Sequence, residues 1–535
     1  MSGRAPDSTF VAMGLPWRTI VLALGLMAWA NGALGGIESA DVTLDYVAQK
    51  ALDRARKPFH SPRADLPEFL RADALNYDKY REIRFRPERA LWASDKLPFR
   101  IEFFHPGYLY EEPVHVFEFF KTHLQEVRFV SDFFDYGSLQ FPRQVPANTG
   151  YAGFKILYPL NQANAPDELG SFLGASYYRL LGKGQRYGPS ARGLALDCGE
   201  TDRPEEFPIF TDWWLGKPET NSTSLRLFAL VDSVSCVGAY QFDIRPGDTT
   251  VVDIEAALYL READKIAAVD PKRKPINSIG LAPLTSMFWF GPASDARFDD
   301  YRTAVHDSDG LLMQLNGGEM LWRPLDNPPR LTHQYFEATN LMGFGLLQRN
   351  RDFNAYQDLF NLYNQVPTIW VKPRGGWGEG AVNLVELHTT YEGLDNIVAF
   401  WSPKTNPPPL TAMRFGYSQW WTWESDRSLS TNKVVGTMVG NDLTGPDRKL
   451  FAIDFSGSAL FALAETNPPE AIASCGANAT IVDRQVLKVP ATGAWRVMLK
   501  FAPKPGNKEP VDLRCALSSR GHQLSETWTY YWNPP

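Results

Sequence analysis

Residues 251–260 read Val-Val-Asp-Ile-Glu-Ala-Ala-Leu-Tyr-Leu, and this stretch decides the fold class. Every second side chain from Val252 to Leu260 is apolar, whereas the intervening positions include Asp253 and Glu255. A period of two is typical of a β-strand that buries one face. The same alternation recurs at residues 225–231 and 495–501, with turn residues between such stretches. The sequence therefore predicts an all-β sandwich architecture.

One helix is expected near the N-terminal end. Apolar residues at 44, 47, 48, 51, 52 and 55 have the spacing of one helix face, and the pattern stops at Lys57-Pro58. Asp41 or Thr43 is a suitable N-cap.

Composition limits the classes of function. The chain has 535 residues, and its 16 Trp, 21 Tyr and 33 Phe make aromatic residues 13 % of the total. Its net charge of −7 argues against nucleic acid as the main partner, since that would require a basic face. An aromatic-rich, mildly acidic chain is typical of proteins that bind neutral polar ligands such as sugars.

The first 35 residues have the pattern of a secretory signal peptide. Arg4 and Arg18 precede an apolar run from Ile20 to Ala30, and small residues follow it. Eleven residues are too few to span a bilayer, so we expect no stable membrane anchor. A buried N-terminal helix is the alternative.

Export would make the four cysteines candidates for disulfide bonds. Three connectivities are possible, and proximity in the chain favours Cys198–Cys236 and Cys475–Cys515. Buried free thiols are the alternative.

A Pro-rich stretch suggests how the chain is divided. Residues 402–409 read Ser-Pro-Lys-Thr-Asn-Pro-Pro-Pro, which cannot continue a strand ladder. We therefore expect a large β-sandwich over residues 36–400, a linker over 401–410 and an immunoglobulin-like β-sandwich over 411–535.

Carboxylates among aromatic residues are the candidate chemistry. Asp395 precedes a hydrophobic strand, with Glu392 three residues earlier, and Asp307 lies in the turn 306–310. Glycoside hydrolysis needs two carboxyl groups, one as acid and one as base, although acids at such places also occur simply in turns. No nucleotide-binding, metal-ligating or cofactor motif is present, so no cofactor or metal is expected.

Several motifs carry a resemblance to a known family. The chain resembles the periplasmic glucan biosynthesis protein G/D family, and more closely its G type. The shared segments are 153–155, 172–179 (Phe-Leu-Gly-Ala-Ser-Tyr-Tyr-Arg), 190–195 (Ser-Ala-Arg-Gly-Leu-Ala), 206–208, 282–288 (Ala-Pro-Leu-Thr-Ser-Met-Phe), 306–308, 322–325, 343–348, 351–353, 395–398 and 525–528.

The resemblance implies a galactose-mutarotase-like sandwich, a periplasmic location in Gram-negative bacteria, and β-1,2-linked glucan as the ligand. D-type relatives act on this glucan with inversion, which by position makes Asp395 the general acid and Asp307 the base. Tyr363 and Glu392 occupy positions near the proton relay.

Further residues are candidates for binding glucan. Arg179 and Arg192 could orient sugar hydroxyls, with structural ion pairs as the alternative. Trp289, Trp322 and Trp377 are candidate stacking platforms, with packing in the core as the alternative.

Two functions therefore remain open. The first is an inverting hydrolase or transglycosylase that acts on β-1,2-glucan. The second is a non-catalytic glucan-binding component that assists a partner, such as an inner-membrane glucan synthase. Retention of both acids, Asp395 and Asp307, favours the first, whereas departures from the D type at Leu362 and Gln365, which flank Tyr363, favour the second.

Overall fold

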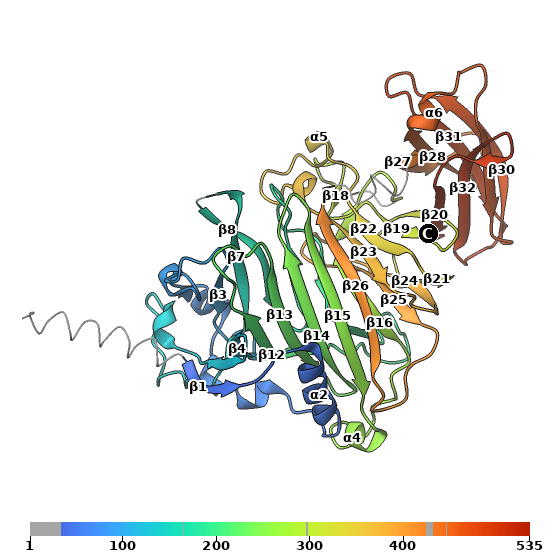
Figure 1. The fold of residues 1–535 in the computed structure, drawn as a ribbon. Coiled ribbons are helices and arrows are strands. Elements are labelled where there is room, and N and C mark those ends of the chain that lie inside the picture. The colour runs from blue at the N-terminus through green and yellow to red at the C-terminus, as the bar shows by residue number, and fades with distance from the viewer. Residues whose placement is uncertain (1–33, 164, 296–297, 424–431, 446, 535) are drawn as a thin grey trace, which may run out of the picture.

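The computed structural model describes residues 34–534 apart from residues 164, 296–297, 424–431 and 446. In this part of the chain, two β-sandwiches lie side by side, the larger preceding the smaller in sequence (Figure 1). The expectation of an all-β sandwich fold is confirmed.

The largest sheet of the described structure has 16 strands. Its central strand β15 (Thr250–Leu260) contains the alternating stretch quoted first, and the expected strand at 225–231 is β13 (Leu225–Asp232). The strand order is β1 (Leu34–Ser39), β5 (His123–Val127), β4 (His115–Phe120), β12 (Ile209–Gly216), β13, β14 (Cys236–Arg245), β15, β26 (Met413–Thr422), β23 (Thr368–Arg374), β22 (Gly343–Leu347), β19 (Gly310–Gln314), β20 (Met320–Pro324), β34 (Thr527–Trp532), β32 (Val511–Ser519) and β29 (Glu470–Cys475), with β33 (His522–Gln523) beside β32.

A second sheet of ten strands packs on the large one, and their apolar faces form the main core. Its order is β21 (Thr332–Thr339), β24 (Glu379–Glu386), β25 (Ile397–Pro403), β16 (Ile279–Ser286), β10 (Ser190–Arg192), β9 (Tyr177–Leu180), β8 (Ala165–Leu173), β7 (Gly153–Gln162) and β3 (Arg100–Phe104), with β11 (Ala195–Leu196) beside β16. Two short ladders, β17 (Phe288–Phe290) with β18 (Val305–His306) and β2 (Arg84–Phe85) with β6 (Phe134–Asp135), lie outside these sheets.

The expected helix is α2 (Leu44–Ala55), and its N-cap is Thr43, whose Oγ1 accepts a hydrogen bond from the Tyr46 amide. Its face of Val47, Ala48 and Ala51 is buried on the outer side of the large sheet. The other α-helices of the described chain are short: α3 (Tyr77–Tyr80), α4 (Ala263–Ala267), α5 (Phe353–Tyr356) and α6 (Ser458–Phe461).

The Pro-rich stretch 401–410 is not a linker between domains, and this expectation was wrong. Strand β25 continues to Pro403, and β26 then pairs with β15 and β23 in the middle of the large sheet. The prolines end one strand and turn the chain into the opposite sheet. The large sandwich therefore extends through Thr422, and the smaller one begins at β27.

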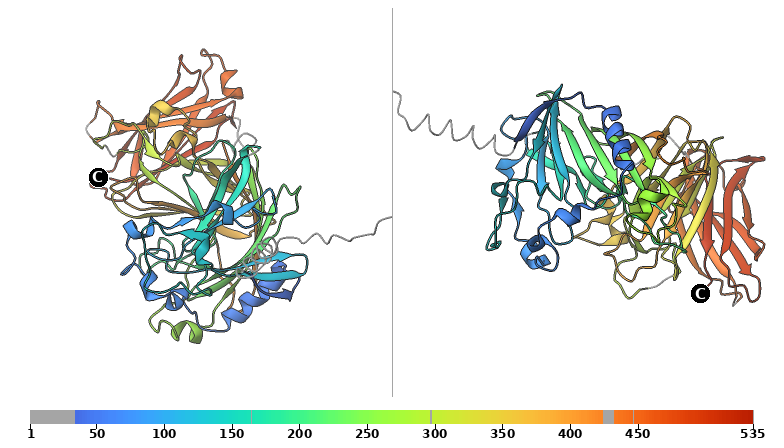
Figure 2. Two further views of the ribbon diagram at one scale, coloured as in Figure 1. Left: turned by 90° about the vertical axis from the view of Figure 1, so that its left-hand side faces the viewer. Right: turned by 90° about the horizontal axis from the view of Figure 1, so that it is seen from below.

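The smaller sandwich packs a four-stranded sheet on strands β34, β32 and β29. The order in the four-stranded sheet is β27 (Asn432–Asn441), β28 (Lys449–Gly457), β31 (Trp495–Pro503) and β30 (Ala479–Lys488), where β31 contains the expected strand at 495–501. Strand β34 also pairs in parallel with β20, so one sheet runs without a break from the large sandwich into the small one (Figures 1 and 2).

All four cysteines are free thiols, so the expected Cys198–Cys236 and Cys475–Cys515 disulfides are absent. Cys198 and Cys236 belong to different apolar clusters. Burial raises the pKa of the Cys515 thiol to about 12, as expected of a cysteine that serves as a small core residue.

The signal-peptide expectation for residues 1–35 falls almost wholly outside the described residues. Residues 34 and 35 begin strand β1. Among the residues that are described, no helix is long and apolar enough to cross a membrane.

Candidate functional site

The two carboxyl groups that the resemblance singles out lie on neighbouring segments of the large sandwich. Asp395 lies two residues before β25, and Asp307 directly follows β18. Asp307 is buried, whereas the side chain of Asp395 is partly open to solvent. The charge of Asp395 is one of the causes that raise the pKa of Asp307, so the two groups interact directly through space.

Asn396 fixes the relative position of these two segments. Its Oδ1 accepts a hydrogen bond from the Phe288 amide at 2.8 Å, and its Nδ2 donates to the Phe288 carbonyl at 3.0 Å. The adjacent Met287 carbonyl accepts a hydrogen bond from the Asp307 amide at 2.8 Å. The hydrogen bonds of residues 287 and 288 therefore fix the position of Asp307 relative to Asp395.

Asp307 sits in an environment that favours its protonated form. Burial, and next the charge of Asp395, raises the pKa of Asp307 to about 8, although Arg179 acts in the opposite sense. A Cβ on Gly188 would come within 3.2 Å of Asp307 Oδ1 and 2.5 Å of Val366 Cβ. Only glycine lets the chain close over this carboxyl group, because no side chain fits between it and Val366.

Asp395 opens instead into a cavity of about 360 Å³ between β9 and the loop before β25. The cavity is lined by Tyr110, Ser171, Leu173, Tyr177, Tyr178, Arg179, Gly393, Leu394 and Asp395. Arg179 places a guanidinium nitrogen 3.6 Å from Asp395 Oδ2. The cavity is concave, has aromatic walls and holds a carboxylate beside a cation, which suits a ligand with many hydroxyl groups.

Two buried hydroxyl groups lie behind Asp395. Ser190 Oγ donates to Asp395 Oδ2 at 3.4 Å and lies 2.5 Å from Thr285 Oγ1. With the Ser190 proton directed at the carboxylate, Thr285 is the donor to Ser190. This pair orients the carboxyl group from the side away from the cavity.

Tyr363 and Glu392 are brought together, as the resemblance implies. Tyr363, in the short 3-10 helix η5 (Tyr363–Gln365), donates a hydrogen bond from its hydroxyl to Glu392 Oε2 at 2.8 Å. Burial is the first cause that raises the pKa of Tyr363 well above its usual value, and the charge of Asp307 contributes. Tyr363 therefore lies within electrostatic reach of Asp307 and keeps its proton at neutral pH.

Arg302 holds Glu392 in place and pairs with two further acids. Its guanidinium contacts Glu392 and Asp358 at 2.8 Å each, and it also pairs with Asp300 at 2.8 Å. The hydrogen bonds to Asp300, and next those to Glu392, raise the pKa of Arg302. Three loops are therefore tied to one cation beside Tyr363.

Arg192 makes a structural ion pair, which was the alternative to orienting sugar hydroxyls. It is buried, forms a 2.6 Å ion pair with Glu205, and lies over the Tyr177 and Phe207 rings. It touches the cavity only through Tyr177, one of the lining residues.

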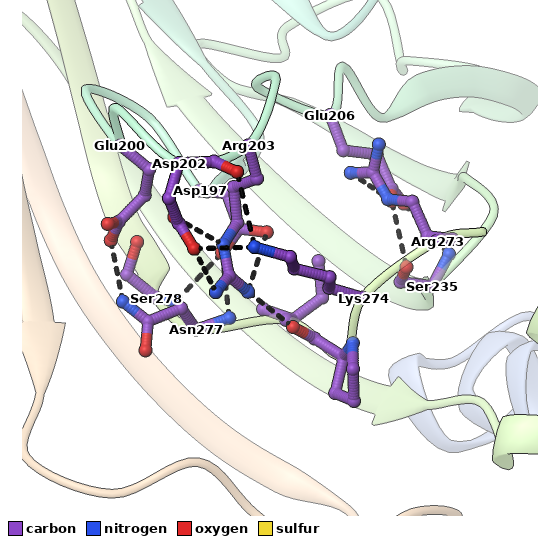
Figure 3. Close-up of polar contacts among 12 residues, drawn as sticks. Asp197, Glu200, Asp202, Arg203, Glu206, Ser235, Arg273, Lys274, Asn277 and Ser278 are labelled. Carbon is purple, nitrogen blue, oxygen red and sulfur yellow. Dashed lines mark hydrogen bonds and ion pairs between the residues drawn. The ribbon is translucent and has the colours of Figure 1, made fainter.

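Polar contacts anchor the segment from Asp197 to Glu206, as Figure 3 shows. Asp197 accepts hydrogen bonds from the amides of Asn277 and Ser278, and Glu206 pairs with Arg273 at 2.7 Å. Glu205, the ion-pair partner of Arg192, lies in this same segment.

The three candidate tryptophans are not gathered at the cavity. Trp289 packs in the apolar cluster that contains Tyr363. Trp322 is buried beneath Arg349, 3.8 Å from ring centroid to guanidinium carbon, at the junction of the two sandwiches. Trp377 packs against Trp401 and donates a hydrogen bond to the Gly416 carbonyl at 3.2 Å. Each makes the packing contacts that were the alternative to sugar stacking.

Residue patterns alone did not reveal several residues that shape the site. Ser190, Thr285, Asn396 and Gln348 lie inside the shared motifs, which is the signal that could have identified them. Gln348 hydrogen-bonds to His306 and to the Tyr363 carbonyl, and so braces both segments. Arg302 lies outside every such motif.

The chain is similar to proteins of a known family over most of its length. The family described as "Periplasmic glucan biosynthesis protein, MdoG" matches residues 43–532. A glucans biosynthesis protein G of Ralstonia nicotianae is 41 % identical over 521 residues, which cover 96 % of this chain and 99 % of the relative.

Two further relatives bear the same name. The protein of Bradyrhizobium diazoefficiens is 42 % identical, covering 91 % of this chain and 93 % of the relative. That of Serratia proteamaculans is 39 % identical, covering 91 % and 92 %. The similarity is therefore to the G type over almost the full length, and the chain belongs to the periplasmic glucan biosynthesis protein MdoG family.

Proposed function

We propose that this protein binds β-1,2-linked glucan in the Asp395 cavity and cleaves or transfers it with inversion. The observation that carries the proposal is the pairing of Asp307 and Asp395, held in register through residues 287–288 beside a cavity that contains Arg179. Membership of a family of periplasmic glucan biosynthesis proteins supports glucan as the ligand and the periplasm as the site of action.

In the proposed reaction Asp395 donates a proton to the glycosidic oxygen as the bond from that oxygen to the anomeric carbon breaks. A water molecule attacks the opposite face of the sugar, and its proton passes to Asp307 through sugar hydroxyls or water. Arg179 stabilises the carboxylate that Asp395 becomes. Tyr363 and Glu392 position the relay, since their hydrogen bond lies within electrostatic reach of Asp307.

One observation favours a second function, that of a non-catalytic glucan-binding component. With a pKa of about 8, Asp307 is mostly protonated at neutral pH, when a base should be ionised. A protonated Asp307 would instead donate a hydrogen bond to a sugar hydroxyl. A partner such as an inner-membrane glucan synthase would then act on the bound chain.

The decisive experiment uses the full mature chain and linear β-1,2-glucan. We expect the parent protein to shorten or redistribute the chain lengths, and Asp395→Asn to lower the rate at least a hundredfold while it still binds glucan. Chain lengths are followed by chromatography and binding by calorimetry. Retained binding without any change in length for the parent would support the second function, and full turnover by Asp395→Asn would refute the assignment of the acid.

The pH dependence separates the two roles of Asp307. As a base Asp307 must lose its proton while Asp395, as the acid, keeps its own, so the rate of turnover is expected to pass through a maximum as the pH is varied and to fall on either side of it. As a hydrogen-bond donor it must keep its proton, so glucan affinity would instead fall above pH 8. Loss of glucan affinity above pH 8, without a maximum in the rate of turnover, would contradict the role of base.

A further inference from the structure

Five large apolar side chains stand out into solvent on the loops that surround Glu392 and Tyr363. Phe360 is 97 % exposed, Leu359 and Tyr301 are each 75 % exposed, and Tyr391 and Leu394 are about half exposed. We call this set the outer rim. Solvent exposure of so much apolar surface is unfavourable in a free protein, and a cluster of this kind marks a binding surface.

The outer rim is held rigidly. Arg302, whose side chain is 8 % exposed, joins Asp300, Asp358 and Glu392, and these acids lie on the three loops that carry the rim. Asp358 Oδ1 also accepts hydrogen bonds from the amides of residues 360 and 361, at 2.8 Å each. Phe360 is therefore presented to solvent by a fixed turn, which limits the entropy lost on binding.

The outer rim continues the wall of the Asp395 cavity. Leu394 belongs to both, and a Cβ on Gly393, which also lines the cavity, would come within 2.4 Å of the Tyr391 ring. A cavity of about 360 Å³ is near the small end of ligand sites and accommodates only a short stretch of polysaccharide. A longer glucan chain has to leave the cavity over neighbouring surface, and the rim provides that surface.

The chemistry of the rim suits a neutral sugar chain. Pyranose rings present apolar C–H faces, which pack on aromatic and aliphatic side chains, while their hydroxyl groups remain in water. We propose that the outer rim is a second glucan-binding surface that grips the part of the chain emerging from the Asp395 cavity. This inference rests on the proposed function and adds a preference for long chains.

The test measures binding as a function of chain length, in the Asp395→Asn background so that no glucan is consumed. The ligands are a β-1,2-linked trisaccharide and a long, size-fractionated β-1,2-glucan, and affinity is measured by calorimetry. Combined Leu359→Ala and Phe360→Ala substitution is expected to weaken binding of the long chain about tenfold and to leave trisaccharide binding unchanged. Because both side chains are exposed, the melting temperature should not change.

Two controls sharpen the result. Phe360→Tyr retains an aromatic face and should keep the affinity for the long chain. Leu443→Ala removes a leucine that is 99 % exposed on the smaller sandwich and should change nothing.

Equal weakening for both ligands, or no weakening for either, would overturn the proposal. Failure of both the unsubstituted protein and Asp395→Asn to bind either ligand would refute glucan as the ligand, and thereby the proposed function itself. Loss of self-association in the double variant, with glucan affinity intact, would assign the rim to a second copy of this chain instead.

Discussion

Glutamine in place of Glu526 is expected to lower the free energy of unfolding by about 3 to 5 kcal/mol. Glu526 is buried just before β34 and accepts two hydrogen bonds from Arg349, at 2.9 and 2.8 Å, and one from the Val434 amide at 2.9 Å. Glutamine matches its size but carries no charge. The Arg349 guanidinium then loses the charge of Glu526 at a buried position between the sandwiches, and removing one member of a buried ion pair is strongly destabilising.

The measurement is equilibrium unfolding in urea, followed by tryptophan fluorescence. The matched control is Glu379→Gln, which breaks an exposed ion pair with Lys404 of 2.6 Å. Exposed pairs contribute less than about 1 kcal/mol, so this variant should unfold almost as the parent does. If both variants lost the same free energy of unfolding, the contribution of the Arg349–Glu526 pair to stability would not depend on its burial.

Asparagine in place of Asp307 is expected to make the protein progressively more stable than the parent as the pH rises. The folded-state pKa of Asp307, about 8, lies above the value near 3.9 of an unfolded aspartate. The contribution of this group to stability is therefore complete below pH 4 and is lost as the pH rises to 8. The slope is at most about 1.4 kcal/mol per pH unit, and asparagine has no such dependence.

Thermal unfolding of both proteins between pH 4 and 9 measures this effect. Asp264→Asn is a suitable control, because Lys265 lowers the pKa of this exposed carboxyl group and any trend should run in the opposite direction. Parallel curves for Asp307→Asn and the parent would show that Asp307 ionises in the folded protein as easily as in the unfolded chain.

The sequence was a reliable guide wherever structure is local. The period of two at residues 251–260 and the helix face from Leu44 follow from backbone geometry alone, and both are confirmed. The prolines at 407–409 correctly indicated the end of a strand. They could not reveal that the next strand returns to the same sandwich, because that depends on long-range pairing with β15 and β23.

The sequence predicted only part of the candidate site. Neither Asp307 nor Asp395 has a local pattern that sets it apart from an ordinary turn residue, and the resemblance alone paired them. Arg302 was missed because its importance lies in three ion pairs that form only when distant loops meet. The disulfide prediction failed because nearness in sequence does not bring two sulfur atoms together.

The parallel pairing of β34 with β20 also has a consequence for the order of folding. Glu319 and Thr527, which share a hydrogen bond beside this pairing, are separated by 208 residues of chain. One edge of the large sandwich therefore keeps unpaired backbone groups until a segment from the far end of the chain arrives. Contacts between such distant segments form slowly, and an open strand edge favours association with other chains. Until this seam closes, the large sandwich therefore has an exposed strand edge that favours aggregation.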